Sequence, residues 1–393
     1  MAIDLEKIKK QRAKPVMAAV KNTALPALAE AKVDFSFKKL YLKLQSIGTV
    51  SGKDKIFFVQ NLQVMIRSGL PLDRSLKTLA DQTRNKYFQK IIADLASQTE
   101  KGIAFAQSLG KYQKVFGDLF INMVEAGEVS GRLEDVLSQL YVQIKKLQEL
   151  KSRVISAMTY PVIVTVAMVG IGIGMMIFVV PKITTIFEDM SAELPAATKL
   201  LINISNFIVN NGVASFLIFF AFIIFLVISL KARVSNYFYH ALFLKLPVFG
   251  PIIKKINLAK FSRTLSSLIK TDIPIVKSFE ITAQILGNRL YKKSLMESVE
   301  EVKAGLSLTE VLKKYPKLYP PVIIQMTAAG EETGTVDEVL GELAGFYEDE
   351  IDQIMKTLPS IIEPILILAL GAAVAVMAVA IIMPMYTLTQ HIN

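Results

Sequence analysis

The sequence has no cysteine among its 393 residues and only two histidines, His240 and His391. Without thiols, a disulfide framework, a thiolate nucleophile and a cysteine-ligated metal centre are all excluded. The Walker pattern G-x-x-x-x-G-K-[ST] and the zinc pattern H-E-x-x-H are missing too. We therefore expect a protein that is not an enzyme and that needs no cofactor and no metal.

Charged residues are missing from three long stretches, which run over 154–181, 200–230 and 364–390. Each stretch is longer than the roughly 20 residues that a helix needs to cross a bilayer. Core helices of a soluble protein rarely run so far without a charge. We therefore predict three transmembrane helices, at 160–181, 212–230 and 363–386.

Lysine and arginine are distributed unevenly around these stretches. Residues 1–159 hold 26 of the 45, residues 160–230 hold two and residues 231–393 hold 17. Cytoplasmic segments of membrane proteins are enriched in these residues. We therefore expect a protein that crosses the membrane several times, with cytoplasmic domains at 51–159 and 231–362. The loop at 182–211 and the tail at 387–393 are expected outside the cytoplasm.

The N-terminal segment is strongly basic. Residues 1–55 carry twelve Lys and Arg against five acidic residues, and the start lacks the apolar core of a secretory signal. We expect a cytoplasmic tail over 1–50. It is interpreted either as a disordered segment that reinforces the topology or as a contact for anionic lipid or an acidic partner. No nucleic-acid-binding module is recognisable, so no direct contact with nucleic acid is expected.

The sequence repeats itself without a gap after 203 residues. The matching pairs include Phe58/Phe261, Pro71/Pro274, Gly127/Gly330, Glu128/Glu331, Gly131/Gly334, Pro161/Pro364 and Pro181/Pro384. The unit is one soluble domain followed by one membrane helix, used twice. The second transmembrane helix returns the chain to the same side, which agrees with the distribution of basic residues.

Each soluble copy has apolar residues at helical spacing, interrupted by Gly, Pro and Asn. This pattern predicts an all-α protein with two tandem bundles of about six helices each. The last helix of the first copy starts near Leu133 and meets no breaker before Pro161, and the second copy repeats this from Val336 to Pro364. We expect both helices to continue into the membrane, with each proline kinking its helix or marking the point where it enters the bilayer.

The most distinctive motif is a pair of G-E-x-x-G segments, formed by Gly127, Glu128 and Gly131 and by Gly330, Glu331 and Gly334. One interpretation is a tight helix–turn–helix connection, with glycines at positive φ and Ser or Thr capping the next helix. The other is an exposed loop that offers an acidic contact to a partner. The two interpretations are compatible.

Acidic residues are concentrated in one segment of the second copy. Between Glu331 and Asp352 there are nine acids and no Lys or Arg. This segment could be a solvated helix face, a docking surface for a basic partner or a weak site for a divalent cation.

Small residues recur inside the predicted spans at Gly170, Gly172, Gly174, Gly371 and Ala375. The G-x-G-x-G order does not indicate dinucleotide binding, because a strand–helix context is impossible inside a span. Small residues allow membrane helices to approach closely, so we expect packing between spans or formation of a homo-oligomer.

Together, these features resemble the inner-membrane platform proteins of type IV pilus and type II secretion machines, the PilC/GspF family. The resemblance rests on the ordered set F-x-x-x-L, G-x-P-L and A-G-E-x-S-G-x-L in duplicate, over roughly residues 36–390. In the second copy Asp272 and Thr333 replace the usual Gly and Ser. In the first, Gln60 stands where the family often has Arg, which Arg263 retains.

The resemblance implies a scaffold that couples a cytoplasmic hexameric ATPase to the assembly or disassembly of pilins or pseudopilins. It also implies contacts with other inner-membrane assembly proteins and with lipid, and it leaves pilus, secretion and DNA-uptake machines open. The G-E-x-x-G segments would then be candidate ATPase contacts. The alternative is a small membrane transporter or channel component, which would need polar groups at mid-membrane and more spans.

Overall fold

The computed structural model describes residues 48–189, 196–231, 233–247 and 249–390. Every regular element in these ranges is a helix, as predicted. The basic tail predicted at 1–50 lies almost entirely outside the described residues, as does the end of the C-terminal tail.

The first copy of the repeat forms a bundle. Its helices are α3 (Gly52–Arg67), α4 (Leu72–Gln82), α5 (Lys86–Glu100), α6 (Phe105–Gly110), α7 (Gln113–Phe116), α8 (Asp118–Val129) and α9 (Leu133–Phe178). The expected breakers fall between helices, since Gly69, Gly102 and Gly117 all have positive φ. Asn85 caps α5 through its side-chain oxygen, which accepts from the backbone of Tyr87 and Phe88.

The second copy forms a matching bundle. Its helices are α14 (Phe249–Lys270), α15 (Ile275–Ile285), α16 (Arg289–Lys303), α17 (Leu308–Lys313), α18 (Pro321–Thr333) and α19 (Val336–Gln390). The described part of the second copy thus has six helices. The first copy has seven, because it also contains the four-residue helix α7. The estimate of about six helices per copy agrees with both bundles.

Four helices are described between the two copies. They are α10 (Val180–Asp189), α11 (Ala196–Asn210), α12 (Gly212–Lys231) and α13 (Arg233–Lys245). The segment at 182–211, predicted to be an extracytoplasmic loop, contains most of α10 and all of α11.

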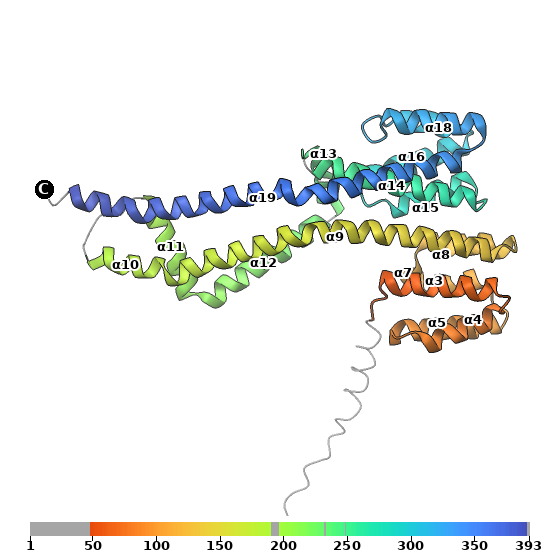
Figure 1. Cartoon of the computed structure of the whole chain (residues 1–393), viewed down its shortest axis with the longest axis horizontal. Helices are drawn as coiled ribbons and strands as arrows, with labels where there is room; N and C mark the ends of the chain where they lie inside the picture. The colour runs from red at the N-terminus through yellow and green to blue at the C-terminus, as the bar shows by residue number, and fades with distance from the viewer. Residues whose placement is uncertain (1–47, 190–195, 232, 248, 391–393) are drawn as a thin grey trace, which may run out of the picture. The chain divides into compact units, whose positions relative to one another are not determined.

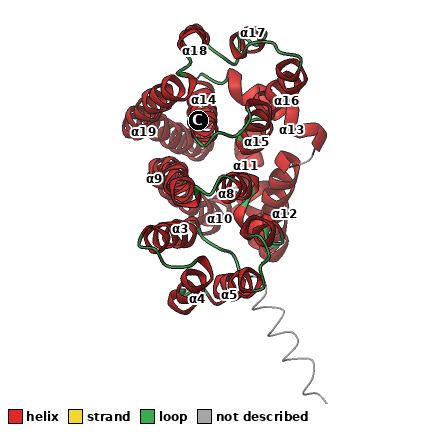
Figure 2. Ribbon diagram, turned by 90° about the vertical axis from the view of Figure 1, so that its right-hand side faces the viewer, coloured by secondary structure: helices red, strands yellow, loops and turns green. Residues whose placement is uncertain are grey.

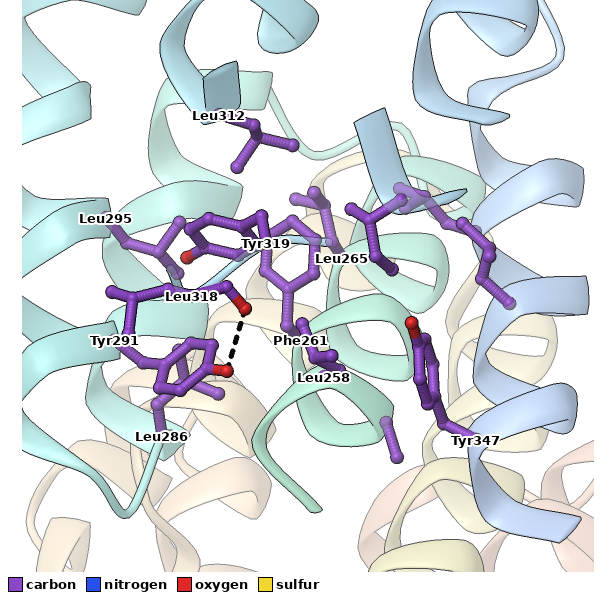
Figure 3. Close-up of a cluster of buried hydrophobic side chains, with 14 of the residues drawn as sticks. Leu258, Phe261, Leu265, Leu286, Tyr291, Leu295, Leu312, Leu318, Tyr319 and Tyr347 are labelled. Atoms are coloured by element: carbon purple, nitrogen blue, oxygen red, sulfur yellow. Dashed lines mark hydrogen bonds between the residues drawn. The ribbon is translucent and has the colours of Figure 1, made fainter. Parts of the chain in front are cut away.

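Each bundle has its own apolar core, built around equivalent aromatic residues. In the first copy, Phe58 is buried against Phe88, with 5.6 Å between ring centroids. In the second copy, the equivalent Phe261 lies 5.3 Å from Tyr319. Figure 3 shows this second core, in which the buried hydroxyl of Tyr291 donates to the carbonyl of Leu318 at 2.8 Å.

The last helix of each bundle is continuous, as the sequence predicts. Helix α9 runs for 46 residues through Pro161, and α19 runs for 55 residues through Pro364. At about 1.5 Å per residue, each helix is roughly 70–80 Å long. Neither proline ends its helix, so each bundle is joined to its apolar segment without a flexible linker.

Two described helices are long and apolar enough to cross a membrane, within Leu133–Lys182 and Val336–Val379. Their most apolar windows are not buried inside the protein. The second predicted span corresponds to α12. The chain bends by 103° between Thr198–Asn210 and the α12 segment Gly212–Phe222. If these two helical segments together form one broken span, the described residues contain three candidate spans.

The two copies pack against each other through α9. This helix contacts α3 of its own bundle and both α14 and α19 of the other bundle, while α8 contacts α15. Figure 1 shows α9 and α19 side by side and leaving their bundles in the same direction. Figure 2 views these helices nearly end-on.

Candidate functional site

The first G-E-x-x-G motif lies where α8 ends and α9 begins. Gly127 and Glu128 belong to the last turn of α8, so they are not part of a loop. The carboxylate of Glu128 accepts hydrogen bonds from the backbone N–H groups of Phe105 at 2.7 Å and Ala106 at 2.9 Å. These are unsatisfied donors at the start of α6, where Ala104 offers no side-chain cap. Glu128 therefore caps a helix that lies 23 residues earlier in the sequence.

The second motif repeats this arrangement. The carboxylate of Glu331 accepts from the backbone N–H groups of Leu308 and Thr309, the latter at 3.0 Å, and from the Thr309 hydroxyl. A carboxylate at a helix N-terminus is stabilised by charge-assisted hydrogen bonds and by the helix dipole. Both motif glutamates therefore have a structural partner inside their own bundle.

The first glycine of each motif lets two helices approach closely. A Cβ atom at Gly127 would lie 2.9 Å from Cβ of Val136, on α9. A Cβ atom at Gly330 would lie 3.1 Å from the backbone Cα of Val336, on α19. Both glycines are buried and helical, so their role is close packing and they do not supply a positive φ.

The second glycine of each motif makes the turn. Gly131 has φ 67° and Gly334 has φ 71°, in the left-handed region that favours glycine. The prediction that Ser or Thr caps the following helix is wrong for Ser130, because α9 has no side-chain cap. The Ser130 hydroxyl instead donates back to the carbonyl of Ala126 at 2.7 Å, and Thr333 does the same to Ala329 at 2.8 Å.

Three acidic side chains of α19 are paired with basic residues of the same chain. Arg263 donates two hydrogen bonds to Glu348, at 2.8 and 3.1 Å. Lys146 of the first copy lies 3.4 Å from the same carboxylate. Two further pairs join Arg153 to Asp352 at 3.2 Å and Lys255 to Glu350 at 3.0 Å. The helix thus docks on basic side chains of α9 and α14.

No group of three or more potential metal ligands occurs within the part of the chain that the structure describes. The cation site considered for the acidic segment therefore has no cluster of ligands there.

A buried polar network joins the two copies. Gln143 of α9 is fully buried and donates to the Thr264 hydroxyl at 3.0 Å. Its side-chain oxygen accepts from the Ser267 hydroxyl at 2.9 Å. Buried polar groups must be satisfied by hydrogen bonds, so this network favours one register between α9 and α14.

One departure from the family pattern has a structural role. Asp272 is the only non-glycine residue with positive φ, at 58°, among the residues described. It occupies the turn position of Gly69, which has φ 82°. Its carboxylate lies 3.0 Å from the guanidinium of Arg132 in the other copy. Aspartate is among the few residues that visit this conformation routinely, so the turn is kept while an inter-copy ion pair is added.

A tyrosine–carboxylate contact also recurs in both copies and was missed from the sequence alone. Tyr112 donates to Asp94 at 2.8 Å, and Tyr315 donates to Glu297 at 2.9 Å. Burial, followed by the hydrogen-bonded carboxylate, raises the pKa of each tyrosine to about 12. Searching the 203-residue repeat for paired polar residues would have found it.

The small residues of the apolar helices make no close contact inside the chain. A Cβ atom at Gly170, Gly172, Gly174 or Gly371 would meet nothing within 4 Å. Ala375 is exposed, as is Pro364, whereas Pro161 is buried. Packing of these surfaces against another helix therefore remains a prediction.

Comparison with known proteins agrees with the repeat. The family described as "Type II secretion system (T2SS), protein F" matches the chain twice, over residues 58–181 and 261–384. Both ends of the two matches are separated by 203 residues, which is the register derived above.

Related proteins come from both kinds of machine. The chain is 33% identical to the type IV pilus assembly protein PilC of Myxococcus xanthus, over 90% of this chain and 84% of the relative. It is 35% identical to PilC of Thermus thermophilus, over 85% and 82%. It is 30% identical to type II secretion system protein F of Aeromonas hydrophila, over 87% and 88%. The chain therefore belongs to the type II secretion system protein F family, which includes the PilC proteins of type IV pili.

Proposed function

We propose that the chain is an inner-membrane platform protein of a type IV pilus or type II secretion machine. In this role it couples a cytoplasmic hexameric ATPase to the assembly or disassembly of pilins or pseudopilins. The observation that carries the proposal is the family match over both copies of the repeat, together with the relatives' names. The protein would act as a scaffold and would not be an enzyme.

The two long helices suggest how motion would be transmitted. Each bundle continues directly into an apolar segment through α9 or α19. A displacement of the bundle by the ATPase would then tilt or rotate the apolar segment, because no flexible linker lies between them. The exposed small-residue surfaces around Gly172 and Gly371 would face pilin helices, sister subunits or lipid.

The proposed topology has three spans, with the N-terminus in the cytoplasm and the C-terminus outside it. Both bundles would then face the ATPase. The G-E-x-x-G segments remain candidate contacts, but their glutamates are bonded within the bundle. The parts free to meet a partner are the exposed residues that follow, above all Val129 and Glu332.

The absence of native cysteine allows a direct test. Single cysteines would be introduced at Ser130, Thr335 and Gly172 and cross-linked in native membranes, and adducts identified by mass spectrometry. We expect the first two positions to capture the ATPase and Gly172→Cys to capture a pilin-like helix. Adducts with lipid or with the protein itself alone, together with normal piliation and secretion in a deletion strain, would contradict the proposal.

A further inference from the structure

The two copies use different faces to contact each other. The first copy contributes α8 and α9, and the second contributes α14, α15 and α19. Because the copies are equivalent in sequence, each also carries the face that its neighbour uses. Within the described residues, the other copy leaves two corresponding faces free, the α18–α19 face of the second copy and the α3–α4 face of the first. Such a head-to-tail contact can be repeated by further subunits.

The free face of the second copy exposes apolar residues at positions that are buried in the first. Met326 is 38% exposed, whereas its equivalent Met123 is fully buried. Phe346 is 51% exposed and corresponds to Gln143, the buried glutamine that bonds to Ser267. Phe346 therefore presents an exposed aromatic ring at the position where the first copy makes a buried polar contact.

The free face of the first copy likewise exposes apolar residues at positions that are buried in the second copy. Val64 is 47% exposed and corresponds to Ser267, which is 1% exposed. Leu70 is 40% exposed and corresponds to Ile273, which is 6% exposed and belongs to the core of the other copy. Since Gln143 contacts Ser267 inside the chain, the repeat places Phe346 opposite Val64 of a second chain.

Charges on the free faces are complementary in the same register. The internal pair Lys146–Glu348 corresponds to Asp349 and Lys145, which form no ion pair within the described residues. The internal pair Arg153–Asp352 corresponds to Lys356 and Glu149. The first pair reverses its signs and the second keeps them, so both remain attractive. Lys356 also lies 2.7 Å from Asp352 of its own helix. Opposite charges at both positions are what a second use of this interface requires.

We propose that a second copy of this chain docks head to tail, with the α18–α19 face of one subunit on the α3–α4 face of the next and on the adjoining side of its α9. Phe346 packs on Val64 at its centre, flanked by Asp349 with Lys145 and Lys356 with Glu149. Helices α9 and α19 run in the same direction, so repeating this contact keeps all apolar helices parallel. The arrangement is therefore compatible with subunits that share one membrane.

The test uses the full-length chain in membranes. A variant with both Val64→Cys and Phe346→Cys would be treated with a mild oxidant and run on a non-reducing gel. We expect a ladder of dimers, trimers and larger species, because each subunit carries both halves of the contact. Each single variant is expected to stay monomeric, since Val64 and Phe346 lie on different faces.

Two control pairs calibrate the result. Gln143→Cys with Ser267→Cys should close within one chain and leave the monomer band, which shows that oxidation works. Val64→Cys with Met296→Cys uses an equally exposed position on α16, where Met296 is 45% exposed, and should give no ladder. No ladder from the Val64/Phe346 pair while the internal pair closes would overturn the proposal. Dimers from either single variant would do so too.

The charges provide a second measurement. In the Val64/Phe346 double variant, Lys145→Glu or Asp349→Lys alone should reduce the ladder about two- to five-fold, as expected for an exposed ion pair. The two changes together should restore it. Independent effects without restoration would contradict the pairing. These assays need neither ATPase nor pilin, so their outcome is separate from that of the proposed platform function.

Discussion

The guanidinium of Arg132 lies 3.0 Å from the carboxylate of Asp272, although 140 residues separate them in the sequence. The contact joins the turn after α8 in the first copy to the turn after α14 in the second. It shows that a departure from the repeat pattern can be a feature of the contact between copies. Two opposing effects meet at Asp272, because the left-handed turn disfavours a side chain while the ion pair favours this one.

The first prediction concerns this balance. Asp272→Gly relieves the backbone and loses an ion pair that is 56% and 80% exposed at its two ends, worth at most about 1 kcal/mol. We expect its unfolding free energy to stay within about 1 kcal/mol of the parent. Asp272→Val loses the ion pair and also strains the turn, since branched residues tolerate positive φ poorly. We expect it to lower the unfolding free energy by about 2 kcal/mol. Thermal melting in detergent would measure both variants, and equal losses would show that the turn conformation is unimportant.

The second prediction concerns the helix-capping glutamates. Glu128→Ala should destabilise the first bundle by about 2–3 kcal/mol, because two charge-assisted hydrogen bonds to α6 are lost. Glu331→Ala should have a similar effect on the second bundle. The exposed neighbour Glu332→Ala is the matched control and should change stability by less than about 0.5 kcal/mol. Hydrogen exchange at the first turns of α6 and α17 would locate the effect.

This prediction also separates structure from partner binding. A charge reversal at Glu128 would unfold the start of α6, so a loss of pilus assembly in that variant would not identify an ATPase contact. Changes at the exposed Val129 or Glu332 are the appropriate probes. A fully stable Glu128→Ala variant would show that the capping contacts do not contribute.

The third prediction concerns the first glycines of the motifs. Gly127→Ala and Gly330→Ala should each cost about 1–3 kcal/mol, because the added methyl group would be forced against the following helix. Gly345 lies in the interior of α19, and a methyl group added there would meet nothing within 4 Å. Gly345→Ala should therefore raise the unfolding free energy by about 1 kcal/mol. The melting temperature should therefore fall for Gly127→Ala and Gly330→Ala and rise for Gly345→Ala. A shared direction would mean that helix propensity outweighs packing.

The fourth prediction concerns pH. His240 accepts a hydrogen bond at Nδ1 from the backbone N–H of Arg289 at 2.9 Å. Burial, and then the nearby Arg289 charge, lowers the pKa of His240 below its usual 6.5. The folded state thus prefers the neutral ring. Its stabilising contribution is fully present above about pH 6.5 and declines as the pH falls from there towards the lowered pKa.

Hydrogen exchange at the start of α16, corrected for intrinsic rates, would measure this effect between pH 7.5 and 5.5. We expect faster opening at the lower pH in the parent chain. His240→Gln offers an acceptor that does not titrate and should remove the difference. A pH dependence that persists in this variant would assign the effect to another group.

Features with a local or repeated signature could be predicted from the sequence. The 203-residue register, the helical bundles and the uninterrupted helices through Pro161 and Pro364 follow from apolar periodicity and from the positions of breakers. The family follows from the same duplicated motifs. These properties depend on neighbours within a few residues or on comparison of the chain with itself.

The fate of individual polar side chains could not be predicted in this way. The spacing of Glu128 and Gly131 is compatible with a loop that meets a partner, yet Glu128 caps a helix 23 residues away. Similarly, nothing local indicates that Arg263 pairs with Glu348, 85 residues later. Such partners depend on which helix faces meet.

The sequence by itself determined the repeat, the all-helical class, the apolar helices and the family, because helical periodicity and hydropathy are local properties that repeated motifs reinforce. Only the tertiary structure decided that the motif glutamates are helix caps, that three acids of α19 pair with the chain's own basic residues, and that Asp272 bridges the copies. The physical reason is that hydrogen bonds and ion pairs need atoms within a few ångströms, and packing alone brings together groups so distant in the sequence.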